Sequence, residues 1–247
     1  MVSMGMLTTG FTFLIFLLAT GMVQSQPTNQ NYVSVGGQPF LILDDMTARV
    51  SDFVDRNRDK LNPEKVSGSL FLTDEWNKGY IKLPDGRVAN ELQLKYDVYT
   101  NSIHFLKDST ELVLTIPVRE FGFFNKADST AQIFRNGYPA TGKLDSLSYY
   151  QVLADGTVTL LKKHLNLLRQ ITPVSGITTY RLEAVSKLYL FYGAKSRLRP
   201  IKNNQHDILS AIPAVLQEKF KVILSEKKYN LKREKDITAL INRLNAR

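Results

Sequence analysis

Cysteine is absent from this chain of 247 residues. Its absence excludes disulfide bonds, a thiol nucleophile, a cysteine-based metal site and an acylated N-terminal cysteine. Histidine is also scarce, and no two of His104, His164 and His206 have the short spacing of a metal-binding pair. We therefore expect no metal ion and no cofactor.

The motifs of common enzyme classes are missing as well. The chain contains no Gly-x-Ser-x-Gly elbow, no His-Glu-x-x-His pair and no glycine-rich phosphate loop. On this basis no catalytic, cofactor-binding or metal-binding residue is assigned. The sequence favours a non-enzymatic binding or scaffold protein.

Residues 1–25 lack lysine and arginine, but they have the apolar core of a signal peptide. The apolar run Phe11–Leu18 is followed by Val23 and Ser25, at positions −3 and −1 of a cleavage site before Gln26. This layout predicts a secretory signal peptide, so we expect an exported, periplasmic protein. The alternative is an uncleaved N-terminus that anchors the protein to the membrane, because the apolar stretch approaches the length of a spanning helix.

Acidic residues are scarce in the C-terminal half. Residues 26–140 hold 13 Lys and Arg against 15 Asp and Glu, a balance of −2, whereas residues 141–247 hold 19 against 8, a balance of +11. Such a half attracts an acidic envelope protein, a glycan or a lipid surface, and export argues against nucleic acid. The alternative is a solvated basic surface without a partner. The basic clusters comprise Lys162, Lys163, Arg197, Arg199, Lys202, Lys227, Lys228, Lys232 and Arg233.

Short strands are predicted throughout residues 67–203. Over 91–98 the apolar residues share one face and the polar residues, Asp97 among them, share the other. Pro84–Arg87 contains Asp-Gly and predicts a hairpin turn, and Pro117 should interrupt the strands. We expect an antiparallel β-meander followed by further hairpins, built as one sheet or as two packed sheets.

The segments on either side of this β region differ from it. Residues 26–66 form a polar lead-in, within which apolar spacing predicts a short helix at 44–58. Residues 204–247 predict two amphipathic helices that form a hairpin packed on the sheet. Pro213 suits the first turn of the main helix, with Ser210 as its candidate cap. The predicted fold class is α+β, with an antiparallel meander and hairpin-rich core and a C-terminal helical hairpin.

Strand and turn patterns recur in five segments, namely 74–86, 94–99, 134–138, 152–161 and 207–213. These segments resemble a family of uncharacterised exported proteins common in Bacteroidota. The resemblance covers residues 67–245, and it implies an exported bacterial envelope protein without assigning an activity or a functional residue.

The best local candidate for a site is Asp74-Glu75-Trp76, where two carboxylates adjoin the only tryptophan. They could bind a sugar, so a carboxylate-dependent hydrolase or carbohydrate-active enzyme is the alternative function. The competing interpretation is a structural loop, because neighbouring residues on a strand point to opposite faces. Arg119, Glu120 and Arg135 are candidates for a polar cluster or for ion pairs at a sheet edge.

Overall fold

The computed structural model describes residues 66–124, 131–172, 176, 178–193 and 197–246, and also the backbone of three short strands that precede them. The chain divides into two units, residues 1–30 and 31–247, and all described residues belong to the second. The predicted signal peptide and its cleavage site therefore lie outside the described residues.

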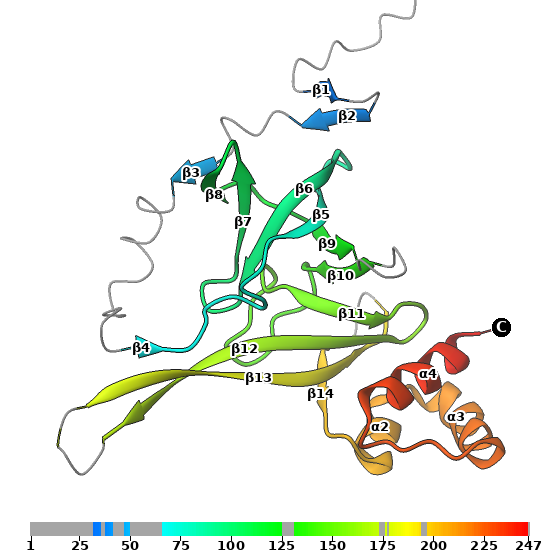
Figure 1. Ribbon diagram of the computed structural model, residues 1–247. Helices are drawn as coiled ribbons and strands as arrows, with labels where there is room; N and C mark the ends of the chain where they lie inside the picture. The colour runs from blue at the N-terminus through cyan, green and yellow to red at the C-terminus, as the bar shows by residue number, and fades with distance from the viewer. Residues whose placement is uncertain are drawn as a thin grey trace, which may run out of the picture. The chain divides into compact units, whose positions relative to one another are not determined.

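One mixed, mostly antiparallel sheet forms most of the fold (Figure 1). Its strands lie side by side in the order β14 (Arg199–Ile201), β13 (Thr179–Phe191), β12 (Thr159–Ile171), β11 (Tyr150–Ala154), β10 (Ala131–Arg135), β9 (Glu120–Phe124), β5 (Asn77–Lys82), β6 (Val88–Asp97), β7 (Ser102–Lys107), β8 (Thr110–Leu114) and β3 (Thr47–Arg49). A further strand, β4 (Val66–Ser67), pairs in parallel with β13. A separate hairpin consists of β1 (Tyr32–Val35) and β2 (Gln38–Leu41). The β region is thus one continuous sheet and not two packed sheets.

The predicted helix at 44–58 is wrong at residues 47–49, which form the sheet's edge strand β3. Thr47 pairs with Leu114 and Arg49 with Leu112, in antiparallel register. An edge strand presents unpaired N–H and C=O groups, and pairing with them outweighs a weak local helix preference. The rest of the predicted helix lies outside the described residues.

The meander is confirmed from β5 to β8, but β9 does not continue it. After the interruption at Pro117 the chain crosses to the other side of β5, where Tyr80 pairs with Gly122. The hairpin turn at Pro84–Arg87 is confirmed by the bond from Leu83 N–H to the Arg87 carbonyl (2.9 Å). Gly86 adopts φ 90°, a conformation that favours glycine.

The buried side chains gather in three clusters along the sheet. The first lies at β5–β10 and is rich in aromatic rings, with Phe121 stacked on Phe134 at 4.8 Å between ring centroids. The second joins β11–β14 to the C-terminal helices. The third is a small tyrosine-rich cluster that includes Tyr138, Tyr150 and Tyr189. Burying these apolar surfaces provides most of the favourable free energy of folding.

Three C-terminal helices replace the predicted two. They are α2 (Gln205–Ala211), α3 (Ala214–Glu226) and α4 (Glu234–Asn245). The first prediction joined α2 and α3, but Ile212 is extended (φ −80°, ψ 140°), because the ring of Pro213 disfavours a helical residue before it. Ser210 is therefore not the cap of the main helix. It lies within α2 and donates to the Asp207 carbonyl.

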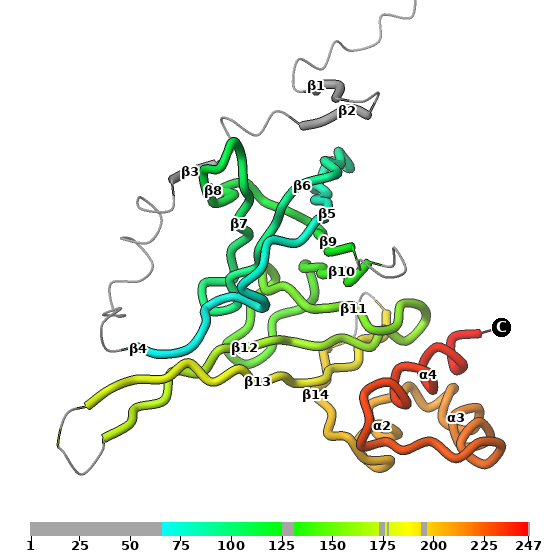
Figure 2. Tube along the Cα trace, viewed as in Figure 1, coloured from blue at the N-terminus to red at the C-terminus, as the bar shows by residue number. Residues whose placement is uncertain are grey.

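β12 and β13 form a long two-stranded ribbon whose far end extends beyond β11. The segment after β4 runs from this ribbon to β5, as the tube in Figure 2 shows. Asn166 fastens that segment to β12, since its amide donates to the carbonyls of Ser69 (3.0 Å) and Leu70 (2.9 Å). The ribbon's near end carries β14 and α2, and there a surface cavity forms.

Candidate anion-binding pocket

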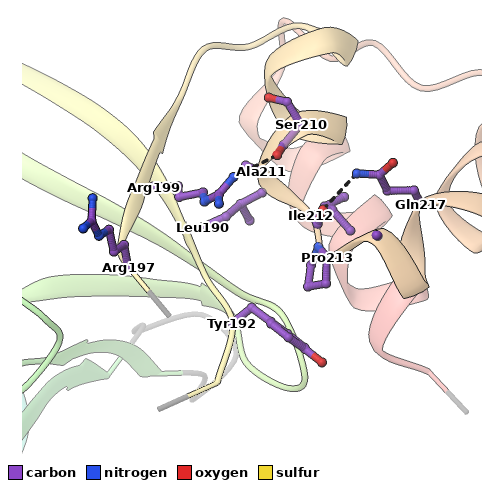
Figure 3. A pocket seen from close by; sticks show the side chains of 10 residues that line it. Leu190, Tyr192, Arg197, Arg199, Ser210, Ala211, Ile212, Pro213 and Gln217 are labelled. Atoms are coloured by element: carbon purple, nitrogen blue, oxygen red, sulfur yellow. Dashed lines mark hydrogen bonds between the residues drawn. The ribbon is translucent and has the colours of Figure 1, made fainter. Parts of the chain in front are cut away.

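A cavity of about 310 Å³ lies where β13 and β14 meet the junction of α2 and α3 (Figure 3). We call it the anion-binding pocket. Its lining residues are Leu190, Tyr192, Arg197, Arg199, Ser210, Ala211, Ile212, Pro213, Ala214 and Gln217. Leu190 lies near the end of β13 and Tyr192 just after it. The break before Pro213 turns the chain to close the opposite wall.

Two exposed arginines supply the charge of the pocket. Arg199 reaches the α2–α3 junction, where its Nη1 donates to the Ser210 carbonyl (3.1 Å). Figure 3 shows the Arg197 side chain pointing in a different direction from Arg199, away from that junction. Neither arginine has a carboxylate within ion-pair distance among the described residues. Each keeps guanidinium donors for an added anion.

The N-terminus of α3 forms part of the same wall. Its N-cap is Pro213, which provides no side-chain hydrogen bond, so the positive end of the helix dipole lacks a side-chain cap. Gln217 reaches back from the next turn and donates to the carbonyls of Leu209 (3.3 Å) and Ile212 (3.2 Å). These hydrogen bonds stabilise the junction between α2 and α3. The N-terminus of α3 therefore presents the positive end of its dipole on this wall of the pocket.

Apolar side chains adjoin this positive wall. Tyr192 in the pocket is 37% exposed, and Val215, which follows the lining residue Ala214, is 80% exposed. Large exposed apolar groups beside charged ones are typical of protein–protein contact surfaces. The pocket can therefore accept carboxylates together with a neighbouring apolar side chain.

The remaining basic residues do not all belong to one surface. Lys162 forms an ion pair with Glu234 (2.9 Å), and Lys163 is buried, with only 3% of its surface exposed. These two lysines are thus removed from the basic surface expected from the sequence. Lys227 lies over the ring of Tyr229, with 5.4 Å from its nitrogen to the ring centroid. Arg197 and Arg199 line the anion-binding pocket together, and no carboxylate is among its lining residues.

Lys163 instead connects β12 to the first cluster of buried side chains by hydrogen bonds. Its ammonium group donates to the Tyr149 carbonyl (3.0 Å), to Asn101 Oδ1 (3.1 Å) and to the Tyr96 hydroxyl (3.3 Å). Burial lowers the pKa of Lys163 to about 8. This role could not be predicted from the sequence, because the three partners come from β6, from the turn after it and from the residue before β11.

The structure does not bring Asp74, Glu75 and Trp76 together. Asp74 accepts a hydrogen bond from Ser69, and Trp76 lies beneath the Lys95 ammonium group, 4.6 Å from its ring centroid. Glu75 lines a cavity of about 600 Å³ to which Asp74 and Trp76 do not contribute, and this cavity shares no lining residue with the anion-binding pocket. These contacts favour the interpretation of Asp74 and Trp76 as parts of a structural loop.

The predicted polar cluster at Glu120 and Arg135 is present. Arg135 binds Glu120 through Nε (2.7 Å) and Asp155 through Nη1 (2.8 Å), and the Tyr80 hydroxyl donates to Glu120 (2.9 Å). Arg119 does not join this cluster, since it donates to the Asn136 carbonyl. The cluster links β5, β9, β10 and the β11–β12 turn.

A second polar cluster, missed from the sequence, surrounds His104. Its Nδ1 lies 2.6 Å from a Glu111 carboxylate oxygen and its Nε2 lies 3.3 Å from Ser102 Oγ. Asp97, predicted on the polar face of β6, is fully buried beside it and accepts from two backbone N–H groups of the following turn. His104 is only 1% exposed, and its ring packs perpendicular to the Phe71 ring with 5.1 Å between the ring centroids. This burial favours a structural network.

Among the described residues, no three metal-ligating side chains come together, and no helix has the length and apolar character needed to span a membrane. Comparison with family models, curated proteins and solved structures gives no match.

Proposed function

We propose that the protein is an exported, non-enzymatic binding protein whose anion-binding pocket holds an acidic segment of a protein partner. The observation that carries the proposal is that Arg197 and Arg199, without a carboxylate partner among the described residues, line one cavity. A guanidinium group can donate two parallel hydrogen bonds to a carboxylate, and this pairing is stronger than one between neutral groups. The +11 balance of residues 141–247 would attract such a segment over a longer range.

An acidic protein segment fits this pocket better than a small free anion. The two arginine side chains point in different directions, so two carboxylates along one chain could reach both. The exposed Tyr192 and Val215 offer apolar contact between or beside those charges. A glycan or a lipid surface could bind the two arginines, but neither would offer carboxylates and apolar side chains at this spacing.

Export is supported by the apolar run and the cleavage pattern of residues 1–25. The resemblance to exported proteins of Bacteroidota agrees with it. The competing hydrolase hypothesis relied on Asp74 and Glu75 acting in one pocket. It has less support, because Asp74 is not among the residues that line the cavity of Glu75.

A fluorescently labelled hexaglutamate peptide provides a direct test of the pocket. We expect saturable binding by fluorescence anisotropy, and about tenfold or greater weakening in the double variant Arg197→Gln/Arg199→Gln. Raising the salt concentration should weaken binding to the wild type as well. A hexaglutamine peptide should not bind.

The matched control is Lys228→Gln/Lys235→Gln, which removes the same charge from exposed positions outside the pocket. We expect it to change the affinity less than threefold, a difference of under about 0.7 kcal/mol. Equal weakening in both double variants would reject a specific pocket. Binding to anionic lipid vesicles without binding of hexaglutamate would reject the acidic protein segment.

A further inference from the structure

The far end of the ribbon formed by β12 and β13 has a strand edge without a neighbouring strand. β11 pairs with β12 only at residues 160–162, whereas β12 continues to Ile171. Among the described residues, no backbone hydrogen bond from another segment reaches 167–172. Alternate N–H and C=O groups of such an edge point away from the paired strand and can bond to an added strand. We call residues 167–172 the ribbon edge.

Apolar side chains are concentrated on the ribbon edge. Leu167, Leu168 and Ile171 are 38%, 37% and 38% exposed, and they are three of the seven large apolar side chains that are exposed among the described residues. Edge strands are usually protected by lysine, proline or a bulge. The ribbon edge has none of these, and its one charge, on Arg169, is paired with Glu183 at 2.7 Å.

This end of the ribbon also has little core of its own. Among the residues of β13 that pair with the ribbon edge, only Leu182 is buried, at the place where Gly68 approaches it. A ribbon of two strands is at best marginally stable in water, and a third strand stabilises it. A strand added at the ribbon edge would bury the three apolar side chains and bond to the outward backbone groups.

A second copy of the chain provides a strand that fits. A two-fold axis perpendicular to the ribbon makes the two edges antiparallel, so that each residue lies opposite a defined residue of the other copy. With the axis at Gln170, Gln170 lies opposite itself, Arg169 opposite Ile171 and Leu168 opposite Thr172. Each of these pairs shares one face of the extended ribbon, and no like charges are opposed.

The neighbouring registers fit less well. An axis at Arg169 would place two guanidinium groups directly opposite each other, which is unfavourable. An axis at Leu168 would extend the pairing to Asn166, where the segment after β4 crosses the ribbon and accepts hydrogen bonds from the Asn166 amide. The axis at Gln170 uses exposed residues of the ribbon edge alone.

We propose that the protein forms a weak symmetric dimer by antiparallel pairing of the ribbon edges of two copies, with Gln170 of one copy opposite Gln170 of the other. So short a pairing buries less area than a standard interface, so the dimer should form only at high protein concentration. The net charge of +9 makes the copies repel each other, and raising the salt concentration should strengthen the dimer. Binding of an acidic segment has the opposite salt dependence, so this proposal and the anion-binding pocket can fail independently.

Because the chain has no cysteine, disulfide trapping tests the register directly. Residues directly opposite each other in an antiparallel pair have Cα atoms about 4.5–5.5 Å apart, a separation that a disulfide bond can span. Under mild oxidation we expect Gln170→Cys to give a covalent dimer. The matched control is Gln93→Cys, at an exposed glutamine of β6 outside the ribbon, and it should give at least about tenfold less covalent dimer.

Leu168→Cys tests the position of the axis, since the two substituted residues would lie about 13 Å apart along the strands and could not be bridged. Leu168→Cys/Thr172→Cys should restore the covalent dimer. All these positions are exposed, so folding is not at risk. The proposal is overturned if the unaltered protein stays monomeric at about 1 mM in analytical ultracentrifugation. It is also overturned if Gln170→Cys gives no more covalent dimer than Gln93→Cys or Leu168→Cys.

Discussion

At the scale of single residues, burial of polar groups explains the most unusual features of the molecule. Lys163 is nearly inaccessible, yet its ammonium group is bonded to three oxygens, all of them uncharged. A charge without a directly bonded counter-charge is costly to bury, and a lowered pKa is the expected result.

Lys163 makes stability depend on pH in a defined direction. Its pKa is about 8 in the folded protein and 10.5 is its ordinary value, so between these values the unfolded chain binds more protons. The free energy of unfolding should therefore rise as the pH increases from 8 to 9.5, by about 1–2 kcal/mol from this group. Urea denaturation at several pH values measures it.

Lys163→Met is the comparison for that pH series. Its free energy of unfolding should lack the rise, whatever its value at pH 7. Tyrosines such as Tyr96, whose pKa burial raises, affect stability only above about pH 10, outside this window. Parallel profiles for the two proteins would show that Lys163 titrates normally.

Close backbone approach gives a second residue-scale prediction. A Cβ atom on Gly79 of β5 would lie 2.1 Å from the Gly122 carbonyl oxygen of β9. Gly79→Ala should therefore separate these strands and lower the free energy of unfolding by about 2–4 kcal/mol. Gly142→Ala is the control, since nothing lies within 4 Å of its Cβ position and only its φ of 58° opposes the change. Equal losses in the two variants would contradict this account.

At the scale of elements, the helices depend on the sheet for their burial and their position. Ile237, Leu240 and Ile241 of α4 are fully buried in the cluster shared with β11–β14. The end of α4 is fixed by Asn245, which accepts from the Val158 N–H (2.9 Å) and donates to the Val158 carbonyl (2.8 Å). The Asn245 side chain thus provides hydrogen-bond partners for the backbone of the β11–β12 turn.

Asn245→Ala should consequently lower the free energy of unfolding by about 1–2 kcal/mol, because both backbone groups of Val158 lose a partner. Asn242→Ala provides the control in the same helix, at an exposed position, and should change stability by less than about 0.5 kcal/mol. Chemical denaturation of both variants makes the comparison. A similar loss in both would mean that Asn245 does not hold the turn.

The strands of this fold were largely predictable, whereas their order and the helix break were not. Alternation over 91–98 and the Asp-Gly turn at 84–87 are local signals, and both led to correct elements. The pairing of β9 with β5 joins segments about 40 residues apart, which local pattern does not encode. The apolar spacing across Pro213 predicts one helix, but Pro213 holds Ile212 in an extended conformation and divides it into α2 and α3.

At the scale of the whole molecule, charge and topology together form the anion-binding pocket. Its residues run from 190 to 217, from the end of β13 to the first turn of α3. The composition of residues 141–247 shows an excess of basic residues. Only the fold shows which of them are available to a partner, because Lys163 is buried and Lys162 is paired with Glu234, whereas Arg197 and Arg199 are exposed. The proposed class of partner is thus inferred from the site, whereas the proposal of export depends on the sequence of residues 1–25.

The most direct test of the central claim is purification of the tagged full-length protein from gently lysed envelopes, with mass spectrometry of its N-terminus and its partners. We predict a chain that begins at Gln26 and an acidic protein partner that is released at high salt. The partner should be lost from Arg197→Gln/Arg199→Gln and kept by Lys228→Gln/Lys235→Gln. A partner retained by the arginine variant, or a protein recovered alone at low salt, would contradict the account.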